Sequence, residues 1–433
     1  MKKIFRRKKQ ENKKPVTEAG HYNYVPASVK RGYFISGVVI TLMVVALFYF
    51  LFMINPIVDG ATKPDTIQTI KKAKEIQRLI DHYYLFDIDE QEQTEYMFVG
   101  QVAALGDKYS AYYTAEEYSQ MMESIEGEYL GIGVTIAQRA EDGEMLIVSI
   151  TEDGPADKAG VMDNDIIREV NGEEVNGMTS SEVSTLIRSD EDETVDLLLY
   201  RESEDKEIEL SVPLAEIEQN TVRSRMLDGK IGYLQITQFA GVTEAQYKAA
   251  LEELQDDGME KLIIDLRDNP GGLVDSACNI LSTILPEGNL VYQEDKEGKR
   301  TYKYNDDGDT LGVPLVVLVN ENSASASEIF TGAIKDYEAG TIIGEQTYGK
   351  GIVQNYFRLS DGSAVRLTVT KYFTPNGNDI HEKGITPDIV VENPEKSEDA
   401  ESETESENSD GDDSIETEND LQLQKAIEVL KKE

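Results

Sequence analysis

The chain has few of the residues on which disulfides, metal sites and nucleic-acid binding depend. Cys278 is the only cysteine among 433 residues, so no intrachain disulfide can form. Three histidines, without an HExxH or paired-cysteine pattern, predict that the chain holds no metal, and we expect no other cofactor. Only 42 Lys and Arg stand against 83 Asp and Glu. The net charge of -41 argues against nucleic acid as a partner, because phosphate binding requires basic patches.

The uneven distribution of charge predicts a membrane anchor near the N-terminus. Residues 1–31 carry ten Lys or Arg against two Glu, a net of +8. Within residues 32–55, about 22 residues follow without a charge, which is long enough to cross roughly 30 Å of hydrocarbon. By the positive-inside rule we expect 1–31 in the cytoplasm and everything after Asn55 outside. A cleaved secretory signal is the alternative, but the run is long for a signal core and has no clean small-x-small end.

Hydrophobic periodicity divides the remaining chain into a multidomain α/β protein. Residues 60–126 have apolar positions at helical spacing and predict a helical cap. Residues 127–215 change to a period of two and predict a small strand-rich domain. In 217–393, short apolar runs alternate with helical segments, which is typical of an α/β domain with strands buried on both faces. Residues 394–420 are almost entirely Asp, Glu, Ser and Thr and are expected to be disordered, and 421–433 to form a short amphipathic helix.

The segment Asn-Glu-Asn-Ser-Ala-Ser-Ala-Ser-Glu at 320–328 indicates a nucleophile. Ser325 lies between a predicted strand at 315–319 and a helix starting at Ala326, whose N–H group and helix dipole could stabilise an oxyanion. Lys350, between two glycines, can act as a base if burial lowers its pKa from about 10.4. This pair predicts acyl transfer, most simply peptide hydrolysis. The alternatives are that Ser325 only caps the helix, in a capping box with Glu328, and that Lys350 is an ordinary surface lysine.

The sequence Asp-Leu-Arg-Asp-Asn-Pro-Gly-Gly at 265–272 follows a second predicted buried strand. The N–H group of Gly271 or Gly272 could supply another oxyanion donor beside that of Ala326, although a simple turn is the alternative. Two other chemistries are less economical. Residues 344–350 have the spacing G-x-x-x-x-G-K of a phosphate loop, but a glycine follows where that loop has Ser or Thr. A Ser-His-acid triad would have to use His381.

Together, these motifs resemble those of the C-terminal processing (tail-specific) serine peptidases of bacteria and plastids, over residues 65–391. The resemblance implies a crotonase- or Clp-like α/β peptidase domain. It also implies that Ser325 is the nucleophile, that Lys350 is the general base and that Gln354 orients the lysine. Two positions depart from the family pattern. Gln346 stands where lysine or proline is usual, and Tyr348 stands where phenylalanine is common.

Residues 127–215 resemble a PDZ domain, which implies that a peptide tail binds as an added strand beside residues 131–137. The carboxylate-binding loop and the side-chain pocket of such a domain match these residues: Leu130, Gly131, Ile132 and Gly133 for the loop, and Val183, Leu186 and Ile187 for the pocket. The alternative is a glycine-bearing strand without a ligand.

The sequence as a whole predicts a single-pass, membrane-anchored serine endopeptidase facing the outside of a bacterium. Its expected partners are proteins or peptides with apolar C-termini, which it cleaves at or near those tails. A non-catalytic PDZ adaptor and a crotonase-like acyl-CoA enzyme are the alternatives, although the acidic surface would repel the phosphates of CoA. A homodimer through the terminal helices is one alternative assembly, and activation and inhibition are the two alternative roles of the PDZ domain.

Overall fold

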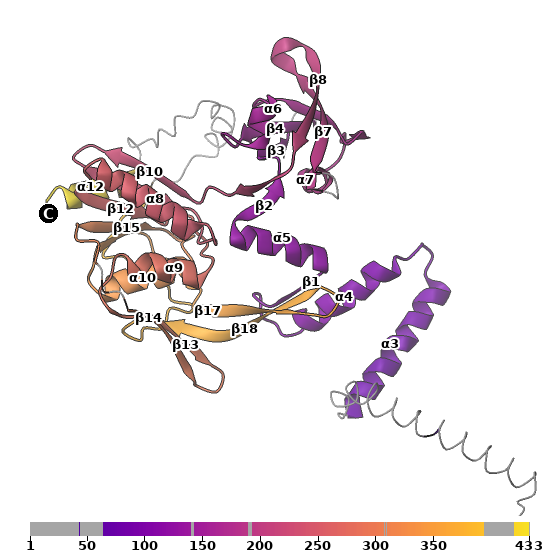
Figure 1. The fold of residues 1–433 in the computed structure, drawn as a ribbon. Coiled ribbons are helices and arrows are strands. Elements are labelled where there is room, and N and C mark those ends of the chain that lie inside the picture. The colour runs from indigo at the N-terminus through magenta and orange to yellow at the C-terminus, as the bar shows by residue number, and fades with distance from the viewer. Residues whose placement is uncertain are drawn as a thin grey trace, which may run out of the picture. The chain divides into compact units, whose positions relative to one another are not determined.

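The computed structural model describes residues 43, 64–139, 143–188, 193–306, 308, 310–393 and 420–432 (Figure 1). The chain divides into two compact units, 1–89 and 90–433. In the first unit, helix α3 spans Pro64–Tyr83. Among the residues described, no helix is both long and apolar enough to span a membrane. The predicted anchor at 32–55 lies outside the described residues apart from Met43, as do residues 1–31 and 394–419.

The second unit begins with helix α4 (Glu90–Ala103), strand β1 (Ala111–Tyr113) and helix α5 (Ala115–Glu126). Helix α5 starts at a capping box, in which Thr114 Oγ1 accepts from the N–H of Glu117 and Glu117 Oε2 accepts from the N–H of Thr114. It ends at Gly127, whose φ of 76° is easily adopted only without a Cβ. The predicted cap is therefore helical but interrupted by a short strand, and β1 pairs far along the chain with β18 (Ala364–Phe373).

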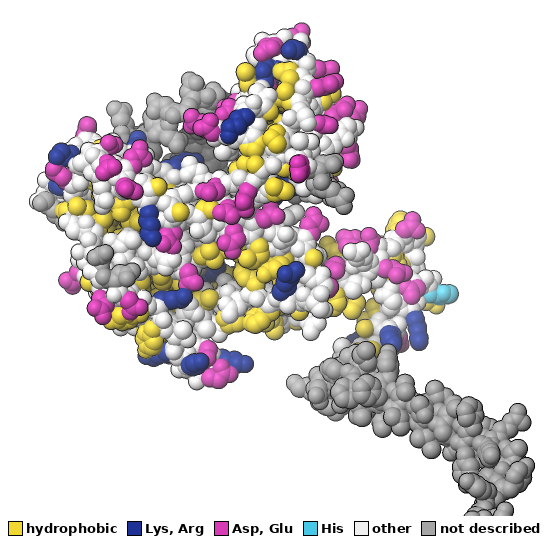
Figure 2. Space-filling view, viewed as in Figure 1, with side chains coloured by type: hydrophobic (Ala, Val, Ile, Leu, Met, Phe, Trp, Pro, Cys, Tyr) yellow, Lys and Arg dark blue, Asp and Glu magenta, His cyan; other side chains and the backbone are white. Residues whose placement is uncertain are grey.

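A small strand-rich domain follows. Its main sheet has the order β3-β4-β5-β7-β8, with β6 beside β5, and β3 lies at its edge. The elements of this domain are β2 (Glu128–Gly131), β3 (Val134–Gln138), β4 (Met145–Ile150), α6 (Pro155–Ala159), β5 (Ile166–Val170), β6 (Glu173–Glu174), α7 (Ser180–Arg188), β7 (Thr194–Arg201), the 3-10 turn η2 (Glu202–Glu204), β8 (Lys206–Pro213) and β9 (Ala215–Glu218). Asp and Glu side chains outnumber Lys and Arg on the face of this domain seen in Figure 2.

Strands β2 and β9 pair antiparallel at the two ends of this domain, and the N–H of Gln219 donates to the carbonyl of Gly127 at 2.7 Å. The chain thus enters and leaves the domain side by side.

The remaining chain forms an α/β domain around a six-stranded sheet of order β10-β11-β12-β15-β16-β19. Its strands are parallel except for β10. The elements are β10 (Val222–Leu227), β11 (Ile231–Ile236), α8 (Thr243–Asp256), β12 (Lys261–Asp265), α9 (Val274–Ser282), β15 (Leu315–Val319), α10 (Ala326–Asp336), β16 (Thr341–Gly344), β19 (Ile389–Val390) and α12 (Leu421–Leu430). A second sheet contains β1, β18, β13 (Gly288–Asp295), β14 (Arg300–Asn305) and β17 (Ile352–Arg358).

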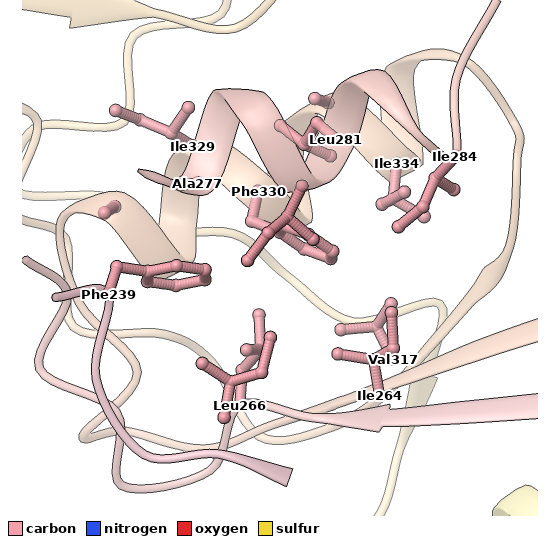
Figure 3. Packing of buried hydrophobic residues seen from close by; sticks show 14 of the residues in the cluster. Phe239, Ile264, Leu266, Ala277, Leu281, Ile284, Val317, Ile329, Phe330 and Ile334 are labelled. Atoms are coloured by element: carbon pink, nitrogen blue, oxygen red, sulfur yellow. The ribbon is translucent and has the colours of Figure 1, made fainter. Parts of the chain in front are cut away.

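The central sheet is buried on both faces, as its continuous apolar strands predict. On one face, helices α9 and α10 pack on alternate strand residues such as Ile264 and Val317, and the rings of Phe239 and Phe330 stack at 6.0 Å (Figure 3). On the other face, Ile263 and its neighbours pack against helix α12. This layered core fixes the carboxyl ends of β12 and β15, where the candidate site lies.

Candidate active site

Ser325 lies at the junction between strand β15 and helix α10. Ser323 and Ser327 on either side are fully buried and donate from Oγ to the carbonyls of Leu266 and Asn269 at 2.8 and 3.0 Å. Ser325 is partly exposed, and its backbone has φ 58° and ψ -112°. A non-glycine residue at positive φ is strained, and such strain concentrates at functional sites. Of the three serines, therefore, only Ser325 is both reachable and held in an unusual conformation.

Glu328 connects Ser325 to the lysine segment. The Glu328 side chain is fully buried. Its Oε2 accepts from the backbone N–H groups of Ser325 at 2.9 Å and of Lys350 at 2.8 Å. Its Oε1 accepts at 2.7 Å from both Thr347 Oγ1 and the N–H of Gly349. The predicted capping contact between Glu328 and Ser325 exists, but no local sequence pattern indicates that the same carboxylate also binds residues 347–350.

These contacts also decide against the phosphate loop. A phosphate loop needs free backbone N–H groups to surround its ligand. In this chain, the N–H groups of Gly349 and Lys350 already donate hydrogen bonds to the Glu328 carboxylate and are not free to bind a phosphate.

Lys350 is partly buried, and burial lowers the pKa of its amino group, with the positive charge of Arg366 acting in the same direction. Its Nζ lies 5.1 Å from the centroid of the Tyr109 ring, within range of a cation–π contact. Within the described part of the chain, no hydrogen bond joins Nζ to the Ser325 side chain. The glycine after Lys350 is required sterically, since a Cβ on Gly351 would lie 2.4 Å from the backbone nitrogen of His381.

Tyr372 provides a second connection between the two residues. Its ring is fully buried in strand β18, and its hydroxyl donates to the carbonyl of Ser325 at 2.9 Å and contacts the carbonyl of Lys350. Glu328 thus binds the backbone N–H groups of Ser325 and Lys350, and Tyr372 binds their carbonyls.

The glycine loop before helix α9 lies directly against Ser325. Gly271 has φ 105°, and a Cβ there would lie 2.8 Å from Ser325 Cβ and 2.9 Å from the nitrogen of Ala326. The N–H of Gly271 donates to Asn269 Oδ1 at 2.8 Å. The N–H groups of Gly272 and Ala326 have no acceptor among the described residues. Of the three candidate oxyanion donors, these two therefore remain free to bind an oxyanion.

The family model described as Peptidase family S41 matches residues 230–391, and that of the PDZ domain matches 129–212. The probable CtpA-like serine protease of Staphylococcus aureus (strain COL) is 32% identical over 84% of this chain and 74% of its own length. The chain belongs to peptidase family S41. It is a serine-type C-terminal processing peptidase with a PDZ domain. The probable CtpA-like serine protease of Staphylococcus epidermidis (strain RP62A) is 34% identical over 75% of this chain and 66% of its own length. The solved photosystem II D1 C-terminal processing protease is 30% identical over 73% of this chain and 86% of its own, with a TM-score of 0.44.

In this S41 peptidase, Gln354 lies on strand β17, and its Nε2 donates to Thr368 Oγ1 at 3.3 Å. Thr368 Oγ1 in turn donates to Asp107 Oδ2 at 2.7 Å. Among the described contacts, the Gln354 amide is not bonded to Lys350. Gln354 therefore belongs to a chain of hydrogen bonds that leads to the turn after helix α4.

That turn is a part of the site that sequence reasoning missed. Tyr109 belongs to a group of tyrosines that the sequence assigns to core packing, yet its ring faces Lys350. Lys108 Nζ lies 4.8 Å from the same ring and donates to the Tyr348 hydroxyl at 3.0 Å. Arg366 Nε donates to the carbonyl of Tyr109 at 2.8 Å and so holds the turn in place. Tyr348, one of the two departures from the family pattern, therefore contacts the cap.

The structure brings only some of the PDZ candidates to the surface. Leu130 is 51% exposed and Leu186 is partly exposed, whereas Gly131 and Gly133 of the loop are buried. Ile132, Val183 and Ile187 belong to the buried core of the PDZ domain. Strand β3 pairs only with β4 among the described strands, so its outer edge is available to an added strand.

The contacts of His381 do not support its use in a Ser-His-acid triad. Its backbone packs against Gly351, and its N–H donates to Asp379 Oδ1 at 3.0 Å. No described contact joins its ring to Ser325.

Proposed function

We propose that Ser325 is the nucleophile and Lys350 the general base of this peptidase. The observation that carries the proposal is the shared Glu328 oxygen, which holds both backbones at fixed positions. The lowered pKa of Lys350 supports it, since a lysine must be neutral to accept a proton.

In the proposed reaction, the Lys350 amino group leaves the Tyr109 ring and takes the proton of Ser325 Oγ as that oxygen attacks the scissile carbonyl. The N–H groups of Ala326 and Gly272 stabilise the oxyanion of the tetrahedral intermediate. Lys350 then delivers its proton to the leaving amine, which departs and leaves an acyl ester on Ser325. Lys350 then takes a proton from a water molecule as that water attacks the ester. When the bond between the acyl group and Ser325 Oγ breaks, Lys350 returns the proton to Oγ, which releases the carboxylic acid product and restores the enzyme.

We further propose that the substrates are proteins with apolar C-termini, which bind as a strand along the edge of β3 with their terminal carboxylate at residues 130–133. The exposed Leu130 and the partly exposed Leu186 provide apolar surface for the last side chain. The uncharged run within 32–55, after a basic segment, supports a single-pass anchor with the peptidase outside the cell.

The test uses the full-length protein in detergent micelles with an unfolded substrate protein that ends either in apolar residues or in Asp-Asp. Cleavage is followed by mass spectrometry. Ser325→Ala and Lys350→Ala should each lower the rate by at least about 10³-fold, the scale on which nucleophile–base units act. Lys371→Ala, at an exposed lysine of β18, is the matched control and should leave the rate unchanged. Near-normal cleavage by either active-site variant would rule out the mechanism, and equal cleavage of both substrates would rule out recruitment by the tail.

A further inference from the structure

We propose that the C-terminal helix α12 is a positioning element of the active site, which acts through Asp420 and Arg267 on the loop that carries Gly272. The helix lies beyond residue 391, where the S41 match ends. The inference rests on the proposed function, because it assumes that the Gly272 loop binds the oxyanion.

Helix α12 is an integral layer of the peptidase domain. Leu423, Ala426 and Leu430 are fully buried and form one apolar cluster with Ile263 and Val316 of the central strands. Among the described residues, α12 is the only helix in this cluster. Without it, a row of apolar side chains on the central sheet would face water, which is unfavourable in proportion to the area exposed.

The first turn of α12 binds an arginine of low exposure. The Arg267 side chain is 13% exposed, and its Nη1 donates to Asp420 Oδ1 at 2.9 Å and to Gln422 Oε1 at 3.1 Å. On its other side, Arg267 Nε lies 3.0 Å from both oxygens of Asp265. The arginine therefore bridges the end of strand β12 and the start of α12. A poorly exposed charge of this kind depends strongly on each of its partners.

Arg267 begins the loop that reaches Ser325. Two residues later, the carbonyl of Asn269 accepts from the N–H of Ala324 at 3.0 Å, and Asn269 Oδ1 fixes the N–H of Gly271. Gly272 follows immediately. An oxyanion donor must be held within about 0.5 Å of its productive position. The direction in which the loop leaves Arg267 therefore bears directly on the placement of the Gly272 N–H group.

A second contact leads from α12 toward the base. Gln422 Nε2 donates to Glu345 Oε1 at 2.9 Å, and the N–H of Glu345 donates to the carbonyl of Val319 at the end of β15. Residues 345–350 then run to Lys350. The same helical turn thus contacts the segment before the oxyanion loop and the segment before the lysine.

The test compares two substitutions in the full-length protein. Asp420→Asn removes the charge that pairs with Arg267 but keeps an N-cap side chain, since asparagine caps helices as well as aspartate does. That cap is the hydrogen bond from the N–H of Leu423 to Asp420 Oδ1 at 2.9 Å. Glu428→Gln is the matched control, because Glu428 is 49% exposed and pairs with Lys425 and Lys432 on the surface of the same helix. Asp420→Glu restores the charge that pairs with Arg267 but is a poor N-cap, so any recovery in this variant reports on the charge rather than on the cap.

We expect Asp420→Asn to lower kcat on the order of tenfold, less than the loss of a whole oxyanion donor, with KM nearly unchanged. The unfolding midpoint should fall as well, because Arg267 loses a charged partner. Asp420→Glu should recover most of that loss, and Glu428→Gln should have no effect. Hydrogen exchange of the backbone N–H groups of 266–272 should be faster in Asp420→Asn alone. This second readout does not need an active enzyme, so it distinguishes failure of this inference from failure of the proposed function. If Asp420→Asn changed neither the hydrogen exchange of 266–272 nor kcat, the inference would be overturned. The same holds if Glu428→Gln lowered kcat as much as Asp420→Asn does.

Discussion

The backbone N–H groups of Ser325 and Lys350 donate to the same oxygen of Glu328, at 2.9 and 2.8 Å. The two residues are 25 positions apart in the chain, and they come together because this buried carboxylate also binds the intervening residues Thr347 and Gly349. Hydrogen bonds to an ionised acceptor are stronger than neutral ones. The carboxylate therefore fixes the frame within which the serine and the lysine side chains can move.

Glu328→Gln should both destabilise and inactivate the peptidase. Each Glu328 oxygen accepts two hydrogen bonds. Glutamine replaces one of these oxygens with an N–H₂ group, so two of the four donors lose their acceptor. We expect a loss of about 2–4 kcal/mol in the free energy of unfolding, measured by urea denaturation. We expect at least about a 10²-fold fall in kcat, because a small displacement of the reacting groups has this effect. Glu252→Gln, at an exposed position of helix α8, is the control. Full activity in Glu328→Gln would show that the carboxylate does not set the site.

The pH dependence should follow the lowered pKa of Lys350. Because only the neutral amine is a base, kcat/KM should rise with pH through that pKa, which lies below the ordinary 10.5. Arg366→Gln removes a nearby positive charge that favours the neutral form. It should therefore raise the pKa of Lys350 and move the acidic limb of the profile to higher pH. Arg358→Gln, on the exposed side of β17, should leave the profile in place. A limb that does not move, or moves to lower pH, would contradict the role of Lys350 as base.

The same shift should affect folding. Since the folded state lowers the pKa of Lys350, the unfolded chain binds the proton more tightly, and this group's contribution to stability should rise with pH between the two pKa values. Lys350→Met removes the titrating group and should flatten that part of the curve, which thermal unfolding at a series of pH values measures. An identical slope in the wild type and Lys350→Met would show that the lysine is not perturbed.

Tyr109 should restrain Lys350 in the enzyme without substrate. Tyr109→Leu removes the ring beneath the ammonium group, whose contact is worth about 0.5–1 kcal/mol, while Tyr109→Phe keeps it. We expect Tyr109→Leu to raise the labelling rate of Ser325 by a fluorophosphonate about two- to fivefold and Tyr109→Phe to leave it unchanged. Equal labelling rates in the two variants would indicate that the ring does not hold the lysine.

Gly271→Ala should slow cleavage strongly for a steric reason. The added Cβ would lie 2.7 Å from the carbonyl oxygen of Ala324 and 2.8 Å from Ser325 Cβ, so the loop or the nucleophile must shift. We expect a fall in kcat of about 10²-fold or more. Gly229→Ala is the matched control, since Gly229 also has a positive φ, of 86°, but faces open space. It should cost roughly 1–2 kcal/mol in unfolding free energy and no activity. Normal turnover in Gly271→Ala would place the oxyanion site elsewhere.

Much of the α/β framework could be predicted from local patterns. Strand β15 spans the predicted residues 315–319, because a short β-branched apolar run buried on both faces has few other solutions, and the small residues after it place Ser325 before helix α10. Strand β1 could not be predicted in the same way. It has three residues and exists only through its pairing with β18, about 250 positions away in the chain.

The details of the site depended on contacts that no local pattern reveals. Val183 and Ile187 share a helical stripe with Leu186, and the sequence does not show which side of that stripe faces the core and which faces a peptide. Ser323, Ser325 and Ser327 alternate in the sequence, and only burial against residues 266–269 separates the two structural serines from the exposed one. Tyr109 belongs to an aromatic group whose usual role is packing, and its contact with Lys350 arises from the fold of the turn after α4.

The paired strands β2 and β9 make the PDZ domain a single excursion from the path of the peptidase chain. Its first and last residues are joined by the hydrogen bond between Gln219 and Gly127, so the two ends stand as close as neighbouring positions in a hairpin. A tight turn of two residues could in principle close that gap. Topologically, then, the PDZ domain is an enlarged loop between helix α5 and strand β10, a module that could be deleted or exchanged without re-routing the chain that builds the Ser325 site.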